Sequence, residues 1–128
     1  MSEFLDRLLK AELPNVQREL PTRRFTIDRL AELAGEDGCE VELRGLPYGR
    51  VQELRELERD QSVQIVLAGC PELKELASSP EVQKKMGTAT PVDTLKAVLL
   101  PGEIEDLDRE VEKLCGYRRQ TIHEVKNG

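Results

Sequence analysis

The chain opens with apolar side chains at helical spacing. Within residues 2–13 four of them recur at intervals of three and four, which predicts a short amphipathic helix. Its apolar face consists of Phe4, Leu5, Leu8 and Leu9. Ser2 can cap this helix and Pro14 ends it. Residues 14–22 hold two prolines and mixed polarity, so we expect a linker there.

Two later segments change to a period of two. Residues 23–28 alternate with Phe25 and Ile27 on one face, and residues 39–44 alternate in the same way. Such alternation is typical of half-buried strands. The connection is too short for a parallel crossover, so we expect antiparallel pairing. Between the strands the sequence predicts about one helical turn and a turn at residues 35–38.

From residue 47 onward the apolar spacing is helical again. Four short helices are expected over residues 47–59, 62–68, 80–86 and 91–99, separated by proline and glycine signals. Residues 72–77 are expected to add a turn or two after the second of these helices. A longer last helix follows the Pro101-Gly102 pair, which we interpret as a corner, and it carries an apolar stripe. The stripe consists of Ile104, Leu107, Val111, Leu114 and Cys115.

These elements predict a single domain over residues 1–128. The expected fold class is α+β and mostly α-helical, with a two-stranded antiparallel β-hairpin packed with about five or six helices. Residues 1–22 would form an N-terminal helix and linker, and residues 118–128 a flexible tail. Only 3% of the residues are aromatic and none is Trp, so the core must be built mainly from aliphatic side chains.

The acidic net charge of the chain argues against nucleic acid as a partner. The net charge is −6, whereas a nucleic-acid binder usually shows a basic domain or stripe. The two basic pairs, Arg23-Arg24 and Arg118-Arg119, have acidic residues nearby, so no nucleic acid is expected as a partner. No apolar run approaches the roughly 20 residues of a membrane span, and the N-terminus lacks the pattern of a secretory signal.

The residue types that support catalysis or metal binding are sparse. Cys39, Cys70 and Cys115 are widely spaced and form no CxxC pair, which favours free thiols in a reducing cytoplasm. The single histidine, His123, lies in the expected tail, and no histidine stands near Cys70 in sequence to activate it. We therefore expect no enzymatic activity, no cofactor and no metal site.

Apolar faces are the remaining candidates for function. The face of the first helix, or part of the stripe on the last helix, could bind an apolar partner helix. The stripe could instead pack on the domain's own core, and both alternatives are compatible with the pattern. The candidate partner-binding residues are Phe4, Leu5, Leu8, Leu9, Ile104, Leu107, Val111 and Leu114.

Several short motifs resemble one protein family. The motif LLPGEI at residues 99–104 follows an ATP helix start at residues 89–91 and precedes LCGY at residues 114–117. Their order and spacing are similar to those of the XkdN-like tail assembly chaperones of phages and prophages. Similar segments also occur at residues 65–71 and 85–91.

The resemblance implies a function and a set of partners. Proteins of this family act during the assembly of long phage tails and are thought to bind the tape measure protein. They keep it soluble until tail tube protein polymerises around it. Many also occur in a longer form made by ribosomal frameshifting, which would extend the tail from Arg118 here.

The resemblance therefore implies a non-enzymatic chaperone of the bacterial host cytoplasm that is absent from the mature virion. Its expected partners are the tape measure protein, the tail tube protein and a longer form of itself, and a homo-oligomer is left open. Two alternatives also remain. One is a structural tail or head-tail component retained in the particle, and the other is a small acidic adaptor that binds a host protein.

Overall fold

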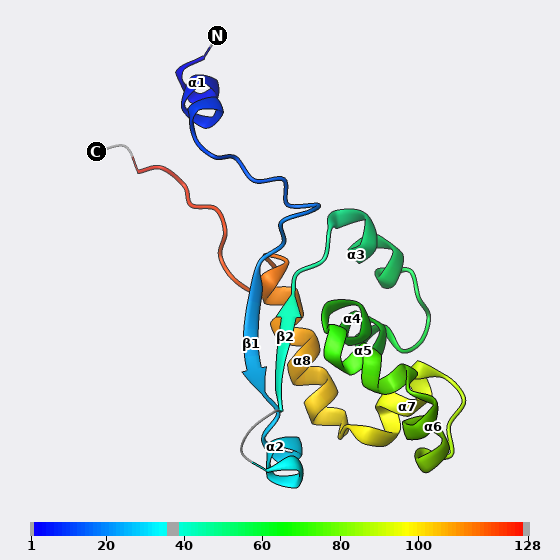
Figure 1. Ribbon diagram of the computed structural model, residues 1–128. Coiled ribbons are helices and arrows are strands. Elements are labelled where there is room, and N and C mark those ends of the chain that lie inside the picture. Colours follow the sequence, from blue (N-terminus) through cyan, green and yellow to red (C-terminus); the bar gives the residue numbers. More distant parts are fainter. Residues whose placement is uncertain (1, 36–38, 127–128) are drawn as a thin grey trace.

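The computed structural model describes residues 2–35 and 39–126, and Figure 1 shows their arrangement. Within these residues the chain forms eight helices and one sheet of two antiparallel strands, β1 (Thr22–Thr26) and β2 (Glu40–Arg44). The helices are α1 (Glu3–Lys10), α2 (Asp28–Ala34), α3 (Tyr48–Arg55), α4 (Gln61–Gly69), α5 (Pro71–Ser78), α6 (Pro80–Met86), α7 (Pro91–Val98) and α8 (Pro101–Leu114). The predicted α+β, mostly helical fold class is confirmed.

The described helices outnumber the five or six that the sequence predicts, because two segments are longer than expected. In the connection between the strands, α2 has seven residues, where about one turn is predicted. α5 is a complete helix of eight residues that begins at Pro71, directly after α4. Residues 36–38 of the predicted turn lie outside the described part of the chain.

The sheet follows the period-two pattern of its two segments. Phe25 lies opposite Val41 across the two strands. Val41 and Leu43 point into the core and are buried. On the other face Arg24 forms an ion pair with Glu40 at 3.0 Å. The alternation of apolar and polar residues therefore separates a core face from a solvent face, as expected for a sheet covered on one side.

The core lies between this sheet and a layer of helices. α8 packs along α4 and against β2, while α5 contacts α7, α4 and β2 (Figure 1). The largest fully buried aliphatic side chains are Leu43, Leu73, Leu95, Val66 and Val111. Each such side chain contributes roughly 1.5–3 kcal/mol when it leaves water. Packing among α4, α5, α7, α8 and β2 therefore supplies much of the stability of the fold.

One glycine sets the distance between α4 and α8. Gly69 is the last residue of α4, and a Cβ atom at this position would lie 2.8 Å from both methyl groups of Val111. Protein interiors are close-packed, so an added methyl group would have to displace its neighbours. Gly69 therefore allows the end of α4 to pack directly on α8.

The Pro101-Gly102 pair belongs to a helix, which corrects its interpretation as a corner between helices. α7 ends at Val98, and Leu99 and Leu100 have extended backbone. Pro101 occupies the first helical position of α8, where the missing N–H of proline would have no intrahelical partner. The chain therefore changes direction at residues 99–100, just before the proline.

Residues 2–21 and residues 118–126 project from the same side of the helical body (Figure 1). α1 lies beyond a linker of residues 11–21, and we call residues 2–21 the N-terminal arm. Residues 118–126 follow the end of α8 without helix or strand and are exposed. We call this segment the C-terminal arm.

Candidate partner-binding surface

α1 presents its apolar face to solvent. Phe4 and Leu9 are 73% and 65% exposed, Leu5 is also exposed, and Leu8 is half-buried. None of the residues of α1 is buried. The helix begins at Ser2, whose Oγ accepts a hydrogen bond from the Leu5 N–H at 3.1 Å. Isolated helices of this length are marginal in water, so a partner that covers the apolar face would also stabilise α1.

The stripe of α8 has a different environment. Ile104, Leu107 and Val111 are buried in the core, where α8 packs against α4 and β2. Leu114, the last residue of α8, is half-buried. In this structure three of the four candidate residues on α8 are therefore used for internal packing, while Leu114 and the α1 face are accessible.

A groove of about 380 Å³ lies where the N-terminal linker passes the end of α8. Its apolar lining includes Val16, Leu20, Tyr48, Leu114 and Tyr117. Tyr48 stands at the start of α3 and is 72% exposed. The groove therefore combines apolar side chains from the N-terminal arm, α3 and the end of α8 into one accessible surface.

The wall of the groove is fixed by close contacts between the end of β2 and the end of α8. A Cβ atom on Gly45 would lie 2.8 Å from the carbonyl oxygen of Leu114, so only glycine permits this approach. The Leu46 N–H donates a hydrogen bond to Sγ of Cys115 at 3.1 Å. Burial raises the pKa of the Cys115 thiol, which favours the neutral form and a structural role.

The guanidinium of Arg55 also supports this wall, because it lies 4.3 Å from the ring centroid of Tyr117. Such cation–π contacts are attractive at this distance.

Most of the exposed large apolar side chains lie on the arms and the groove, while Leu33, Leu57, Met86 and Leu100 lie elsewhere. Besides the α1 face, those on the arms and the groove include side chains that the sequence reasoning did not select. These are Leu13, Val16, Tyr48, Ile122 and Val125. Leu13 follows Leu9 by four residues and continues the same helical spacing, which is a signal that could have identified it. Ile122 and Val125 give no comparable signal, because they stand in a polar segment.

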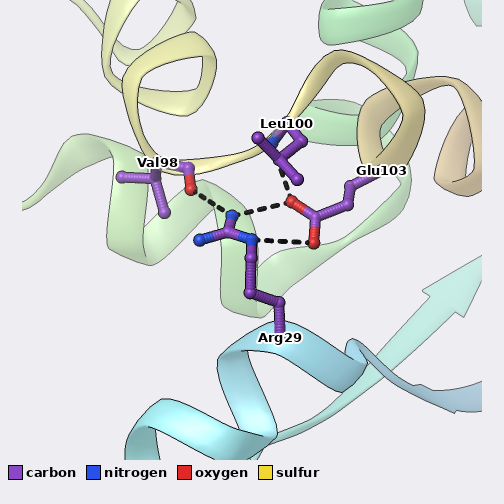
Figure 2. A network of polar contacts seen from close by, with 4 residues as sticks. All are labelled: Arg29, Val98, Leu100 and Glu103. Atoms are coloured by element: carbon purple, nitrogen blue, oxygen red, sulfur yellow. Dashed lines mark hydrogen bonds and ion pairs between the residues drawn. The ribbon is translucent and has the colours of Figure 1, made fainter.

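The LLPGEI motif has a structural role that Figure 2 shows. Glu103 accepts hydrogen bonds from Nε and a terminal nitrogen of Arg29 at 3.1 and 2.7 Å. The same terminal nitrogen donates to the Val98 carbonyl oxygen at 2.7 Å, and the Leu100 N–H donates to Glu103 at 2.7 Å. The network joins α2, the end of α7 and the first turn of α8. The hydrogen bond from Arg29 lowers the pKa of Glu103, which keeps this carboxylate ionised.

A second polar cluster lies farther along α8. The hydroxyl of Ser62 donates to Asp108 at 2.7 Å, and the other carboxylate oxygen of Asp108 is buried without a hydrogen-bond partner among the described residues. Burial raises the pKa of Glu112, and the neighbouring Asp108 carboxylate raises it further. Arg118 offsets part of this effect through an ion pair with Glu112 at 3.4 Å. This cluster was not identified from the sequence, because two acids one helical turn apart are common on exposed faces.

Cys70 and His123, which the sequence analysis considers for catalysis, do not form a common site. Cys70 is fully buried, and burial raises its pKa to about 11, so its thiol is not an activated nucleophile. His123 lies in the exposed C-terminal arm. Among the described residues, no group of three or more His, Cys, Asp or Glu side chains could hold a metal ion. Nor is any described helix long and apolar enough to cross a membrane.

Comparison with known families decides what kind of protein this is. A family model described as phage XkdN-like tail assembly chaperone protein, TAC, matches residues 58–127, more than half of the chain. The chain belongs to the XkdN-like tail assembly chaperone family. The resemblance predicted from the motifs is thereby confirmed. No curated protein and no solved structure matches the chain.

The matched region of this tail assembly chaperone covers α4 to α8 and the C-terminal arm. It contains Glu103, the cluster at Glu112 and one wall of the groove, whereas Arg29, which binds Glu103, lies outside it. α1, β1, α2, β2 and α3 lie outside the match. The exposed apolar face of α1 is therefore a feature of this chain that the family match does not describe.

Proposed function

We propose that this tail assembly chaperone binds the tape measure protein through apolar surfaces at the arms and the groove. In this proposal it holds that client soluble until tail tube protein polymerises, acts without catalysis in the host cytoplasm, and leaves before the tail is complete. The observation that carries the proposal is the α1 face, on which Phe4, Leu5 and Leu9 are exposed. Contiguous exposed apolar surface marks an interaction site more often than chance.

The chemistry of the chain supports a helical, apolar client. An amphipathic helix such as α1 can pair with a second helix along positions spaced by three and four residues. Leu8 and Leu114 extend the apolar surface as half-buried positions. The net charge of −6 would keep the complex soluble, because like-charged complexes repel one another.

Within this proposal the candidate partner-binding residues of α1 and those of α8 have different roles. Phe4, Leu5, Leu8 and Leu9 contact the client. Ile104, Leu107 and Val111 hold α8 in the core and so position the groove, to which Leu114 contributes directly.

Coexpression with the tape measure protein tests the proposal. The Leu9→Glu variant places a charge on the α1 face and is expected to leave most of the client insoluble. Leu33→Glu is the matched control, since Leu33 is an exposed helical leucine on α2, 75% exposed against 65% for Leu9. We expect the control to keep as much client in the soluble fraction as the unsubstituted chain. Equal client solubility with both variants would contradict a role for the α1 face.

Assembled tails provide the second measurement. If the protein acts as a chaperone, purified tails should lack it, while the soluble complex before assembly should contain it. Stoichiometric amounts in finished tails would instead support the structural alternative.

A further inference from the structure

The edge of β1 opposite β2 is open. The Gly45 N–H donates to the carbonyl oxygen of Pro21 at 2.9 Å, so these two residues form a hydrogen-bonded pair. Hydrogen-bonded and non-hydrogen-bonded pairs alternate along an antiparallel ladder. With the observed register, Thr22, Arg24 and Thr26 therefore direct their N–H and C=O groups away from β2.

An independent contact confirms this alternation. Glu42 lies opposite Arg24 in the register, and its N–H donates a hydrogen bond to the carboxylate of Glu72 at 3.2 Å. This bond points away from β1, as it must in a non-hydrogen-bonded pair, and it covers the outer edge of β2. No such bond reaches the outward groups of β1 from the part of the chain that the structure describes. In Figure 1 the side of β1 opposite β2 borders open space, except near the start of the strand, where the C-terminal arm leaves the end of α8.

Two arginines from distant parts of the chain meet beside this edge. Arg23 and Arg119 both line a pocket of about 200 Å³ between β1 and α8, together with Phe25 and Leu114. Their sequence neighbours are already paired, Arg24 with Glu40 and Arg118 with Glu112. Within residues 2–35 and 39–126, neither Arg23 nor Arg119 has an ion-pair partner. Lys113 and Glu110 also line the pocket, and they form an ion pair with each other at 3.1 Å. The acidic protein thus carries a net positive charge beside the open edge of β1.

We propose that the open edge of β1 binds an extended, acidic protein segment as a third strand of the sheet. Main-chain hydrogen bonds join the segment to Thr22, Arg24 and Thr26. A carboxylate of the segment pairs with Arg23 and Arg119, and an apolar side chain two residues away enters the pocket at Phe25 and Leu114. Strand addition of this kind uses backbone bonds for affinity and alternate side chains for specificity. The inference goes beyond client binding at the arms.

Charge complementarity selects this occupant over others. A second copy of β1 in antiparallel pairing about its centre would place Arg24 against Arg24, and like charges directly opposite are unfavourable. A nucleic acid would match the arginines but would leave the outward peptide groups of β1 without strand partners. An acidic strand satisfies both features at once.

A labelled peptide that alternates threonine with one glutamate and one valine, TETVT between glycines, provides the probe. Fluorescence anisotropy with the full chain measures its binding, and TKTVT is the matched peptide. We expect the glutamate peptide to bind about tenfold more tightly than the lysine peptide, because charge juxtaposition discriminates between partners. Arg23→Glu and Arg119→Glu should each reverse this preference. Arg59→Glu, which changes the same charge outside the pocket, should leave it unchanged.

Backbone methylation of the peptide tests strand addition without altering the protein. In a strand, alternate N–H groups face the neighbouring strand. N-methylation of one alternating set of residues should therefore abolish binding, while methylation of the other set should be tolerated. Tolerance of both sets, equal binding of the two peptides, or tighter binding of an oligothymidine than of the glutamate peptide would overturn the proposal.

Discussion

α1 and α8 carry similar apolar stripes but have opposite environments. In both helices apolar residues recur at intervals of three and four. The stripe of α8 is buried from Ile104 to Val111 because α4 and β2 face it. On α1 the corresponding face is exposed from Phe4 to Leu9, and α1 lies beyond the linker, away from the helical body (Figure 1). Helical spacing thus identifies a face, while the rest of the chain decides whether that face becomes core or surface.

The difference has a physical basis in the neighbouring sequence. α8 is held along its length by Gly69, which admits close packing, and by Glu103, which caps its start and binds Arg29. The N-terminal arm has local contacts such as the Ser2 cap and the ion pair between Arg7 and Glu3 at 2.6 Å. Exposed pairs of that kind stabilise weakly, so α1 can leave its position to follow a partner.

A charge in the stripe of α8 should have the largest effect. Val111 is fully buried beside Gly69, and Val111→Asp would place an unpaired carboxylate there. We expect a loss of about 4–5 kcal/mol in the free energy of unfolding, sufficient to unfold much of the chain. Urea denaturation measures it. A loss below about 1 kcal/mol would mean that the α8 stripe is not core, and the contrast with α1 would disappear.

Overpacking the contact between α4 and α8 should have an intermediate effect. Gly69→Ala forces a methyl group against Val111, and we expect a loss of about 1–3 kcal/mol. Gly49→Ala is the matched control in α3, because a Cβ atom there meets no atom within 4 Å. The control should be neutral or gain up to about 1 kcal/mol from helix propensity. Thermal unfolding of the two variants side by side distinguishes close packing from a general effect of alanine.

Removing the cap of α8 should have a smaller effect. Glu103→Ala loses the hydrogen bond from the Leu100 N–H and the contacts with Arg29. The lost cap alone is expected to lower the free energy of unfolding by about 1–2 kcal/mol. Glu105→Ala, at an exposed position in the same turn, serves as the control. If the two variants have the same melting temperature, the LLPGEI network does not stabilise the start of α8.

Two acids of α8 should respond to pH in opposite directions. The pKa of Glu103 is lowered by Arg29, so its contribution is present above the ordinary pKa of 4.5 and is lost as the pH falls through the lowered value. The pKa of Glu112 is raised by burial, so its contribution is present below 4.5 and is lost as the pH rises through the raised value.

The free energy of unfolding of the Glu112→Gln variant, compared with that of the unsubstituted chain, should therefore increase from pH 5 to pH 7. Urea denaturation of both proteins at the two pH values measures this difference. A gain that does not change with pH would contradict the raised pKa.

A polar substitution on α1 should have the smallest effect on stability. Phe4→Ser changes a residue that is 73% exposed, so the free energy of unfolding should stay within about 0.5 kcal/mol. The amount of soluble tape measure protein in coexpression should nevertheless fall. Normal client solubility would place the binding surface elsewhere, whereas a large loss of stability would show that α1 packs on the body.

The sequence predicts the helices and strands of this chain better than it predicts which distant segments come together. Alternation at Phe25 and Val41 predicts the strand pair, and the motifs at residues 89–91 and 99–104 predict the family. The groove could not be predicted, because it joins Val16, Tyr48 and Leu114 from three distant segments. The meeting of Arg23 with Arg119 was equally hidden, since each belongs to a basic pair with acidic sequence neighbours.

Hydrogen exchange, measured by mass spectrometry with and without a tape measure segment, tests the contrast between α1 and α8 most directly. We expect the amides of α1 to exchange quickly in the free protein and those of α8 slowly, because local opening is least costly where few groups are buried. Adding the client should protect α1 and leave α8 unchanged. Loss of protection in α8 while α1 stays unprotected would contradict the account, because the client would then bind the opened stripe of α8.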